Sequence, residues 1–176
     1  MKKQELINKL TVLAEKAQQQ NRDKPFQLYI HSPRYEFDFS FPPKSDLQPF
    51  HIASISKLIS TVALLKLIEE GKCRLDDLLI KYMDPKLLEG IFLSPMDSIT
   101  IKDCLTHRSG AADYFEGKTK EGTPFLEIVT RQPNTYWTQE MILEFARTNL
   151  KPIADKGSKF AYGDTAFMCA MIVIEK

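Results

Sequence analysis

The feature that most constrains the fold is an apolar stretch that runs from Ile52 to Glu70. Its apolar residues fall on nearly every side of an α-helix, and Gly71 follows at a position where helices commonly end. A helix that is apolar almost all round has to be covered by other elements. We therefore predict a central, buried helix over residues 52–70. Its apolar positions are Ile52, Ile55, Leu58, Ile59, Val62, Leu64, Leu65, Leu67 and Ile68.

Three elements are predicted before this helix. Residues 2–20 carry leucines and alanines at helical spacing and predict a helix with one apolar side. Residues 26–30 and 35–41 are rich in aromatic and β-branched residues, and Ser32-Pro33-Arg34 separates them. In the second run, which begins at Tyr35, aromatic residues alternate with polar ones. This pattern predicts a β-hairpin with its aromatic side chains on a buried face.

The chain after the central helix shows no strand pattern. A short helix is expected over residues 100–107, with Ser98 or Thr100 as its N-cap. Another is expected over residues 138–149, with Met141, Ile142, Phe145 and Ala146 on one face, and a last apolar helix over residues 165–175. Two strands do not make an independently stable sheet. We therefore expect further strands to pair with the predicted hairpin and to cover the apolar helices.

Composition narrows the class of protein and its partners. Hydrophobic residues make up 43% of the chain and charged residues 27%, with a formal net charge of +1. This is ordinary for a globular protein and does not predict nucleic acid or an anionic membrane as a partner. The longest apolar run, residues 166–174, is too short to span a bilayer. The first twenty residues lack the apolar segment of a signal peptide, so we expect a cytoplasmic protein as written, or a cell-envelope protein if a signal was removed.

The cysteines and histidines do not suggest a metal or cofactor. Cys73, Cys104 and Cys169 are odd in number and far apart, which predicts buried, reduced thiols. His31 and His51 have no partner at a ligand spacing, so no metal site and no cofactor are predicted. Cys104 lies three residues before His107, but no supporting motif makes them a catalytic pair.

Ser54 and Lys57 form the candidate catalytic motif, because residues three apart on a helix share a face. Serine is a weak nucleophile and needs a base, and a lysine can serve if burial lowers its pKa. In the first turn of the helix, Ser54 could also use its own backbone N–H to stabilise an oxyanion. A serine three residues before a lysine is expected about once by chance in such a chain, so a solvent-facing lysine remains the alternative.

Four segments resemble one family in the same order. FHIASISKLISTVALLKLIEEG (residues 50–71) resembles the nucleophile helix of serine β-lactamases and penicillin-binding proteins. RLDDLLIKYMD (74–84) and ITIKDCLTHRSGAADY (99–114) resemble two further segments of the branch that contains class C β-lactamases, DD-peptidases and related esterases. KGSKFAYGDTAF (156–167) resembles the segment with the second catalytic motif. Together these segments are far more specific than the Ser-x-x-Lys spacing alone.

This resemblance implies a role for each site residue. Ser54 would be the acylated nucleophile and Lys57 the neighbouring proton acceptor. Tyr162 would work with the lysine as base and then as acid to the leaving group. His107 would have a structural role, in a turn that Gly110 makes possible.

Asp164 departs from the family pattern, which usually has asparagine at this position. An ionised aspartate can only accept hydrogen bonds. It would pair with Lys57 and raise the pKa of that lysine, which works against a neutral base. Asp164 is therefore a supporting or substrate-binding residue that leaves the reaction class open and argues against β-lactam hydrolysis in particular.

The resemblance also implies a fold that this sequence does not complete. The family's third motif, Lys-Thr-Gly or His-x-Gly on an edge strand, does not occur in it. We expect the N-terminal part of an α+β, β-lactamase-like fold, in which the C-terminal strands are absent. The expected parts are residues 1–74 (helix, hairpin and nucleophile helix), 75–155 (a helical subdomain) and 156–176 (the tyrosine motif and a return helix). A further C-terminal segment, a complementing chain or a second copy of this chain would then cover the nucleophile helix.

Two hypotheses of function follow. The first is a serine hydrolase that acts by acyl transfer on a small molecule or peptide: a β-lactam, a D-alanyl peptide or a small ester. The second is an inactive family member that serves as a binding or interaction module. Intact Ser54, Lys57 and Tyr162 favour the first, while Asp164 and the missing third motif favour the second.

Overall fold

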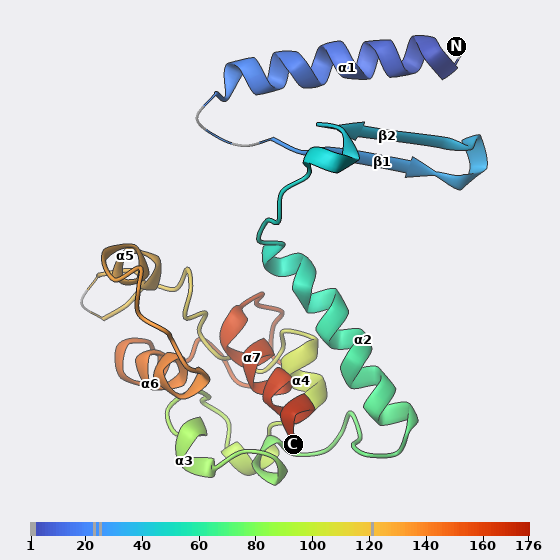
Figure 1. The fold of residues 1–176 in the computed structure, drawn as a ribbon. Helices are drawn as coiled ribbons and strands as arrows, with labels where there is room; N and C mark the ends of the chain where they lie inside the picture. Colours follow the sequence, from blue (N-terminus) through green and yellow to red (C-terminus); the bar gives the residue numbers. More distant parts are fainter. Residues whose placement is uncertain (1–2, 23, 25, 121) are drawn as a thin grey trace. The chain divides into compact units, whose positions relative to one another are not determined.

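A computed structural model describes residues 3–22, 24, 26–120 and 122–176 (Figure 1). The chain forms two compact units, Met1–Ile52 and Ala53–Lys176. Residues 53–70, most of the predicted central helix, belong to the second unit together with the helical region, whereas the sequence analysis grouped them with the hairpin. All four candidate site residues thus lie in one unit.

The first unit contains a helix and a hairpin. α1 (Lys3–Gln20) is the predicted N-terminal helix, although residue 2 lies outside the described part of the chain. β1 (Leu28–Ser32) and β2 (Phe37–Phe41) pair antiparallel, with Ile30 opposite Phe39, and α1 contacts β2. Phe37 and Phe39 are buried and Asp38 is exposed, as the alternation predicted. The prediction was wrong for Tyr35, which is 70% exposed because it belongs to a 3-10 turn, Pro33–Tyr35, between the strands.

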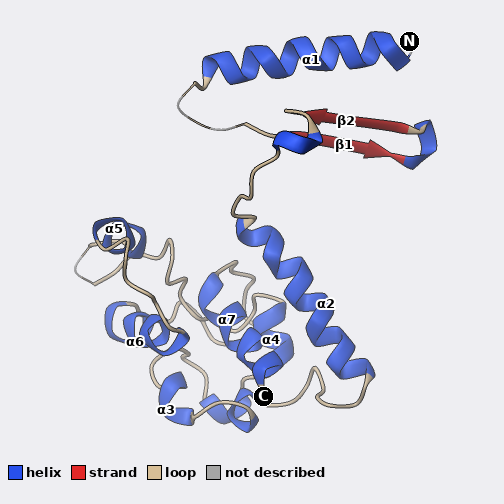
Figure 2. Cartoon of the chain, in the orientation of Figure 1, coloured by secondary structure: helices blue, strands red, loops and turns tan. Residues whose placement is uncertain are grey.

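The second unit is helical in its described residues apart from one isolated bridge between Leu78 and Thr100 (Figure 2). Its α-helices are α2 (Ser56–Glu69), α3 (Pro85–Leu88), α4 (Ile101–Leu105), α5 (Phe125–Arg131), α6 (Gln139–Asn149) and α7 (Asp164–Ile172). Short 3-10 turns occupy Ala53–Ile55, Leu79–Lys81, Met96–Ser98 and Val173–Glu175, and another, Lys44–Asp46, lies in the first unit. None of the helices in the described ranges is long and apolar enough to cross a membrane.

Local signals account for several helix ends. Thr100 caps α4 in a capping box with Asp103, and Thr138 caps α6 through the N–H of Met141. Gly71 ends α2 with a φ of +74°, a conformation that glycine adopts without the strain of a side chain. The predicted face of α6 needs one correction, because Met141 is 40% exposed while Leu143 and Ala146 are buried.

α7 lies at the centre of the second unit and contacts α2, α4 and α6 (Figure 1). Most of its side chains are buried: Thr165, Ala166, Phe167, Cys169, Ala170 and Ile172. Cys73, Cys104 and Cys169 are all free and buried, as predicted.

α2 differs from the predicted central, buried helix. Of its residues only Leu64 is fully buried, because α7 and the turn at Val173–Glu175 contact one side of it. The opposite side is an apolar stripe whose residues are 42–68% exposed. This α2 stripe consists of Ile55, Leu58, Ile59, Val62 and Leu65. No described element of the second unit covers it, so the expectation of a buried helix was wrong for this face.

Candidate active site

Ser54 and Lys57 are adjacent at the start of α2. Ser54 lies in the 3-10 turn Ala53–Ile55 and not, as predicted, in the first turn of the α-helix, which begins at Ser56. Lys57 Nζ still donates a hydrogen bond to Ser54 Oγ over 3.0 Å. The spacing of three residues therefore joins the two groups even though a 3-10 turn replaces the first helical turn.

Tyr162 reaches the same oxygen atom from a distant part of the sequence. Its hydroxyl group donates to Ser54 Oγ over 2.9 Å, across 108 residues of chain. Tyr162 stands two residues before the start of α7, and 53% of its surface is exposed. Ser54 Oγ thus has one nitrogen and one oxygen partner within hydrogen-bond distance, both of them able to take part in proton transfer.

Asp164, the first residue of α7, forms an ion pair with Lys57. Burial alone would lower the pKa of Lys57, whose side chain is only 17% exposed. The hydrogen bonds with Asp164 and Tyr162, together with the negative charge of Asp164, outweigh burial and raise the pKa above its usual value. Lys57 is therefore an ammonium group at neutral pH, which agrees with the effect predicted for an aspartate at this position.

Two aromatic rings also face the ammonium group. Lys57 Nζ lies 5.1 Å from the ring centre of Tyr162 and 5.6 Å from that of Phe167. Cations at this distance from an aromatic face are attracted by its electrons. The rings add to the stabilisation of the charged lysine.

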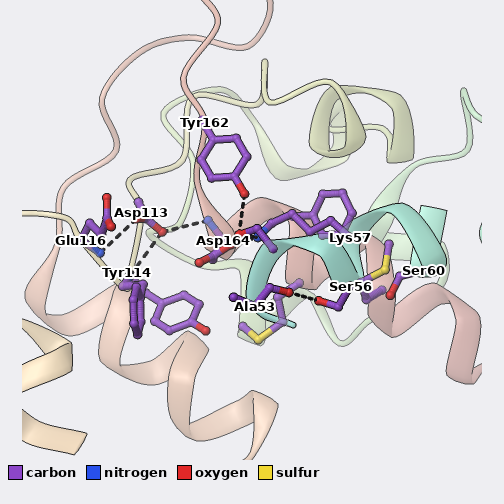
Figure 3. Close-up of a pocket in the computed structure, with 14 residues that line it drawn as sticks. Ala53, Ser56, Lys57, Ser60, Asp113, Tyr114, Glu116, Tyr162 and Asp164 are labelled. Carbon is purple, nitrogen blue, oxygen red and sulfur yellow. Dashed lines mark hydrogen bonds and ion pairs between the residues drawn. The ribbon is translucent and has the colours of Figure 1, made fainter. Parts of the chain in front are cut away.

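These groups border a cavity of about 550 Å³ that lies within the second unit. Figure 3 shows Lys57, Tyr162 and Asp164 together on one part of its wall, with Asp113 and Glu116 on another. Much of the remaining wall is apolar and comes from Tyr114, Phe115, Phe167, Met168 and Met171, and Ala53, Ser56 and Ser60 complete it beside Ser54. The cavity is of the size that small-molecule ligands occupy.

Asp113 is a site residue to which the sequence reasoning assigned no role. Its carboxylate accepts hydrogen bonds from the backbone N–H groups of Asp164 (2.8 Å), Glu116 (3.0 Å) and Phe115 (3.3 Å). It therefore ties the loop after residue 112 to the N-terminus of α7. The signal was present in the sequence, because the segment ITIKDCLTHRSGAADY ends in this aspartate and Tyr114.

His107 lies beside the site and does not pair with Cys104, which is fully buried. Its Nδ1 accepts a hydrogen bond from the N–H of Gly163 over 3.4 Å. Burial, and then the positive charge of Lys57, lower the pKa of His107, so the ring is neutral at pH 7. Among the described residues, no cluster of three or more His, Cys, Asp or Glu side chains could hold a metal ion.

Comparison with known proteins supplies the family. The profile of the family described as β-lactamase matches residues 42–176. The chain belongs to the β-lactamase family. This confirms the resemblance to serine β-lactamases and penicillin-binding proteins and, with the helices and two-stranded sheet described above, the α+β, β-lactamase-like fold class.

Two solved structures illustrate the likeness to the family. A penicillin-binding protein from Bacillus halodurans is 25% identical with a TM-score of 0.60, over 85% of this chain and 45% of that one. A D-stereospecific amidohydrolase from a Streptomyces species is 26% identical with a TM-score of 0.59, over 72% of this chain and 36% of that one. The chain therefore spans less than half the length of either family member.

Proposed function

We propose that this β-lactamase-family chain carries the nucleophile of a serine hydrolase, and that Ser54 is acylated during the reaction. The observation that supports this most directly is the position of Ser54 Oγ, which lies 3.0 Å from Lys57 Nζ and 2.9 Å from Tyr162 Oη. A serine nucleophile needs a neighbouring group that can accept its proton, and Tyr162 Oη is close enough to do so.

The charge of Lys57 decides which neighbouring group can accept the proton of Ser54. As an ammonium group, Lys57 cannot accept the proton of Ser54, whereas Tyr162 can accept it in its phenolate form. The positive charge of Lys57 stabilises the negative charge that develops on the reacting atoms during the attack. Ser54 Oγ attacks the substrate carbonyl carbon while its proton moves to Tyr162 Oη. Tyr162 then returns that proton to the leaving amine or alcohol, and water releases the acyl group from Ser54.

The substrate in this proposal is a small amide or ester. The cavity accommodates a compact ligand, and its walls combine apolar side chains with the carboxylates of Asp113, Glu116 and Asp164. A D-alanyl peptide, a β-lactam and a small ester all present the required carbonyl carbon. The two family members named above are described as a D-stereospecific amidohydrolase and a penicillin-binding protein, and both descriptions fit this class.

A second candidate function is a binding module without catalysis. It is favoured by the Lys57–Asp164 ion pair, which keeps the lysine charged. In that case the same cavity would hold a ligand without reacting with it.

Intact-mass spectrometry separates the two functions. The chain is treated with a labelled penicillin and, separately, with a fluorophosphonate, beside the variants Ser54→Ala and Ser45→Ala. Ser45 is a control serine in the first unit. We expect one adduct that is lost in Ser54→Ala and kept in Ser45→Ala. An unmodified chain with both reagents, or an adduct that persists in Ser54→Ala, would contradict the hydrolase proposal.

A further inference from the structure

We propose that neutral His107 is a positioning residue that holds Tyr162 against Ser54, and that protonation of His107 releases Tyr162. This inference rests on the proposed function for its catalytic consequence, while the positioning itself can be measured without any reaction. It assigns a pH-sensitive role to a histidine that sequence reasoning treated only as part of a turn.

His107 makes a hydrogen bond on each side of Tyr162. Its backbone carbonyl accepts from the N–H of Ala161 over 2.8 Å, and its Nδ1 accepts from the N–H of Gly163 over 3.4 Å. The residues before and after Tyr162 are therefore both bound to one residue. This arrangement restrains the backbone from which the Tyr162 side chain extends toward Ser54.

The imidazole ring also packs against Tyr162 directly. The two ring centres are 4.5 Å apart with the planes tilted by 38°. Phe167 stacks on the imidazole at 5.7 Å, and Phe160 meets it edge-on at 5.9 Å. The position of Tyr162 thus depends on the His107 ring as well as on its hydrogen bonds.

Backbone hydrogen bonds and close packing fix the turn that contains His107. The carbonyls of Arg108 and Gly110 accept hydrogen bonds from the N–H groups of Gly157 (2.7 Å) and Ile153 (2.9 Å). Gly110 approaches residue 154 so closely that a Cβ atom would lie 1.9 Å from the carbonyl oxygen of Ala154. The segment 153–163 is therefore laid against residues 107–110, and His107 has little freedom to move away from Tyr162.

The backbone conformation of His107 is unusual and suggests a matched substitution. His107 has a φ of +54°, in the left-handed region that asparagine tolerates better than most residues. The Oδ1 atom of asparagine can occupy a place close to that of histidine Nδ1 and accept a hydrogen bond, but it cannot be protonated near neutral pH. His107→Asn therefore keeps the acceptor and removes the titration.

The charges around His107 favour its neutral form. Lys57 from α2 contributes a positive charge, while Asp164 from α7 and Asp113 from the loop before Tyr114 contribute negative ones. Burial, and then Lys57, outweigh the two carboxylates and the backbone hydrogen bond with Gly163, and they lower the pKa of His107. Protonation would turn Nδ1 into a donor that faces the N–H of Gly163 and would add a second cation near Lys57. His107 should therefore keep Tyr162 in place at pH values above the usual pKa of histidine. This restraint should be lost as the pH falls through the lowered pKa of His107.

The first test is nuclear magnetic resonance of the whole chain with labelled histidine and tyrosine. We expect an unprotonated Nδ1 at neutral pH and a Tyr162 ring signal, assigned with Tyr162→Phe, that shifts as His107 titrates. In His107→Asn the Tyr162 signal is displaced by the loss of the neighbouring ring, but it should no longer shift between neutral and acid pH. A protonated Nδ1 at neutral pH, or a Tyr162 signal that is indifferent to His107, would overturn the proposal even if Ser54 never reacts.

The second test is the pH dependence of Ser54 modification by a fluorophosphonate. His107→Asn loses the ring contact with Tyr162 and should react more slowly than the unmodified chain at neutral pH, but it should lose the decline of the rate on the acid side. His107→Phe keeps an aromatic ring without the acceptor and should react about tenfold more slowly, as expected for the loss of one part-buried hydrogen bond. If His107→Phe does not fold, the pH profile of His107→Asn decides alone, and an unchanged acid decline in that variant would refute the inference.

Discussion

Helices α2 and α7 have a similar apolar character in sequence but very different surroundings in the structure. α7 is packed on most sides by α2, α4 and α6. α2 buries only Leu64 completely and leaves the α2 stripe exposed. The apolar sequence of a helix therefore indicates that other elements must pack against it, but it does not specify which elements these are.

The two helices also supply the two halves of the candidate site. α2 and the turn before it carry Ser54 and Lys57, while Tyr162 and Asp164 belong to the N-terminal end of α7. The half at α7 is restrained by His107 and Asp113. The candidate nucleophile thus lies just before the less covered helix, and its partners lie at the start of the buried one.

The largest expected effect is a difference in protein stability between substitutions on the two sides of α2. Leu64→Ala should lower the free energy of unfolding by about 2–5 kcal/mol, because it opens a cavity in the core. Leu58→Ala, on a side chain that is 68% exposed, should change it by less than about 0.5 kcal/mol. Chemical denaturation of both variants measures the difference. An equally large effect at Leu58 would mean that the α2 stripe is covered in solution, and the contrast with α7 would disappear.

A second prediction concerns the electrostatic link between the helices. Lys57→Met removes the cation beside Ser54 and Tyr162 and leaves Asp164 without its partner. We expect acylation of Ser54 to slow by about a hundredfold to a thousandfold, as for the loss of a group that stabilises developing charge. Lys66→Met, at an exposed position of the same helix, is the matched control and should react normally. Equal rates in the two variants would show that α2 supplies only the serine.

A third prediction concerns Asp164. Asp164→Asn removes the carboxylate that raises the pKa of Lys57, while the burial that lowers this pKa remains. The pKa of Lys57 should therefore fall, and each unit of decrease makes the neutral amine about tenfold more abundant at a given pH below the pKa. Because the proposed reaction uses the charged lysine, we expect the decline of acylation at alkaline pH to begin at a lower pH than in the unmodified chain. A decline that begins at the same pH in both chains would show that the protonation state of Lys57 does not limit the reaction.

The smallest expected effect concerns the α2 stripe as a contact surface. Exposed apolar patches of this kind favour association, so the chain alone should self-associate at high concentration. Ile59→Lys, which places a charge in the middle of the stripe, should shift the sedimentation profile toward monomer, whereas Lys66→Met should not. A monodisperse monomer of the unmodified chain would contradict this prediction.

Much of the local structure was predictable from the residues alone. The hairpin followed from alternation around Phe37 and Phe39, and the ends of α2 and α4 from Gly71 and Thr100. The errors at Tyr35 and Met141 arose at element boundaries, where a turn or a neighbouring helix decides exposure. The order of the four family segments was also sufficient to indicate the family that the comparison with known proteins confirmed.

The sequence by itself determined where α2 ends, where α4 and α6 begin, and that Ser54 and Lys57 would be neighbours. Helix caps and groups three residues apart both depend on local backbone geometry. The tertiary structure alone decided that Tyr162 meets Ser54 across 108 residues, that His107 binds both neighbours of Tyr162, and that one face of α2 is uncovered within its unit. These contacts depend on how distant elements pack, and the pattern of any single segment carries no information about which partner will cover it.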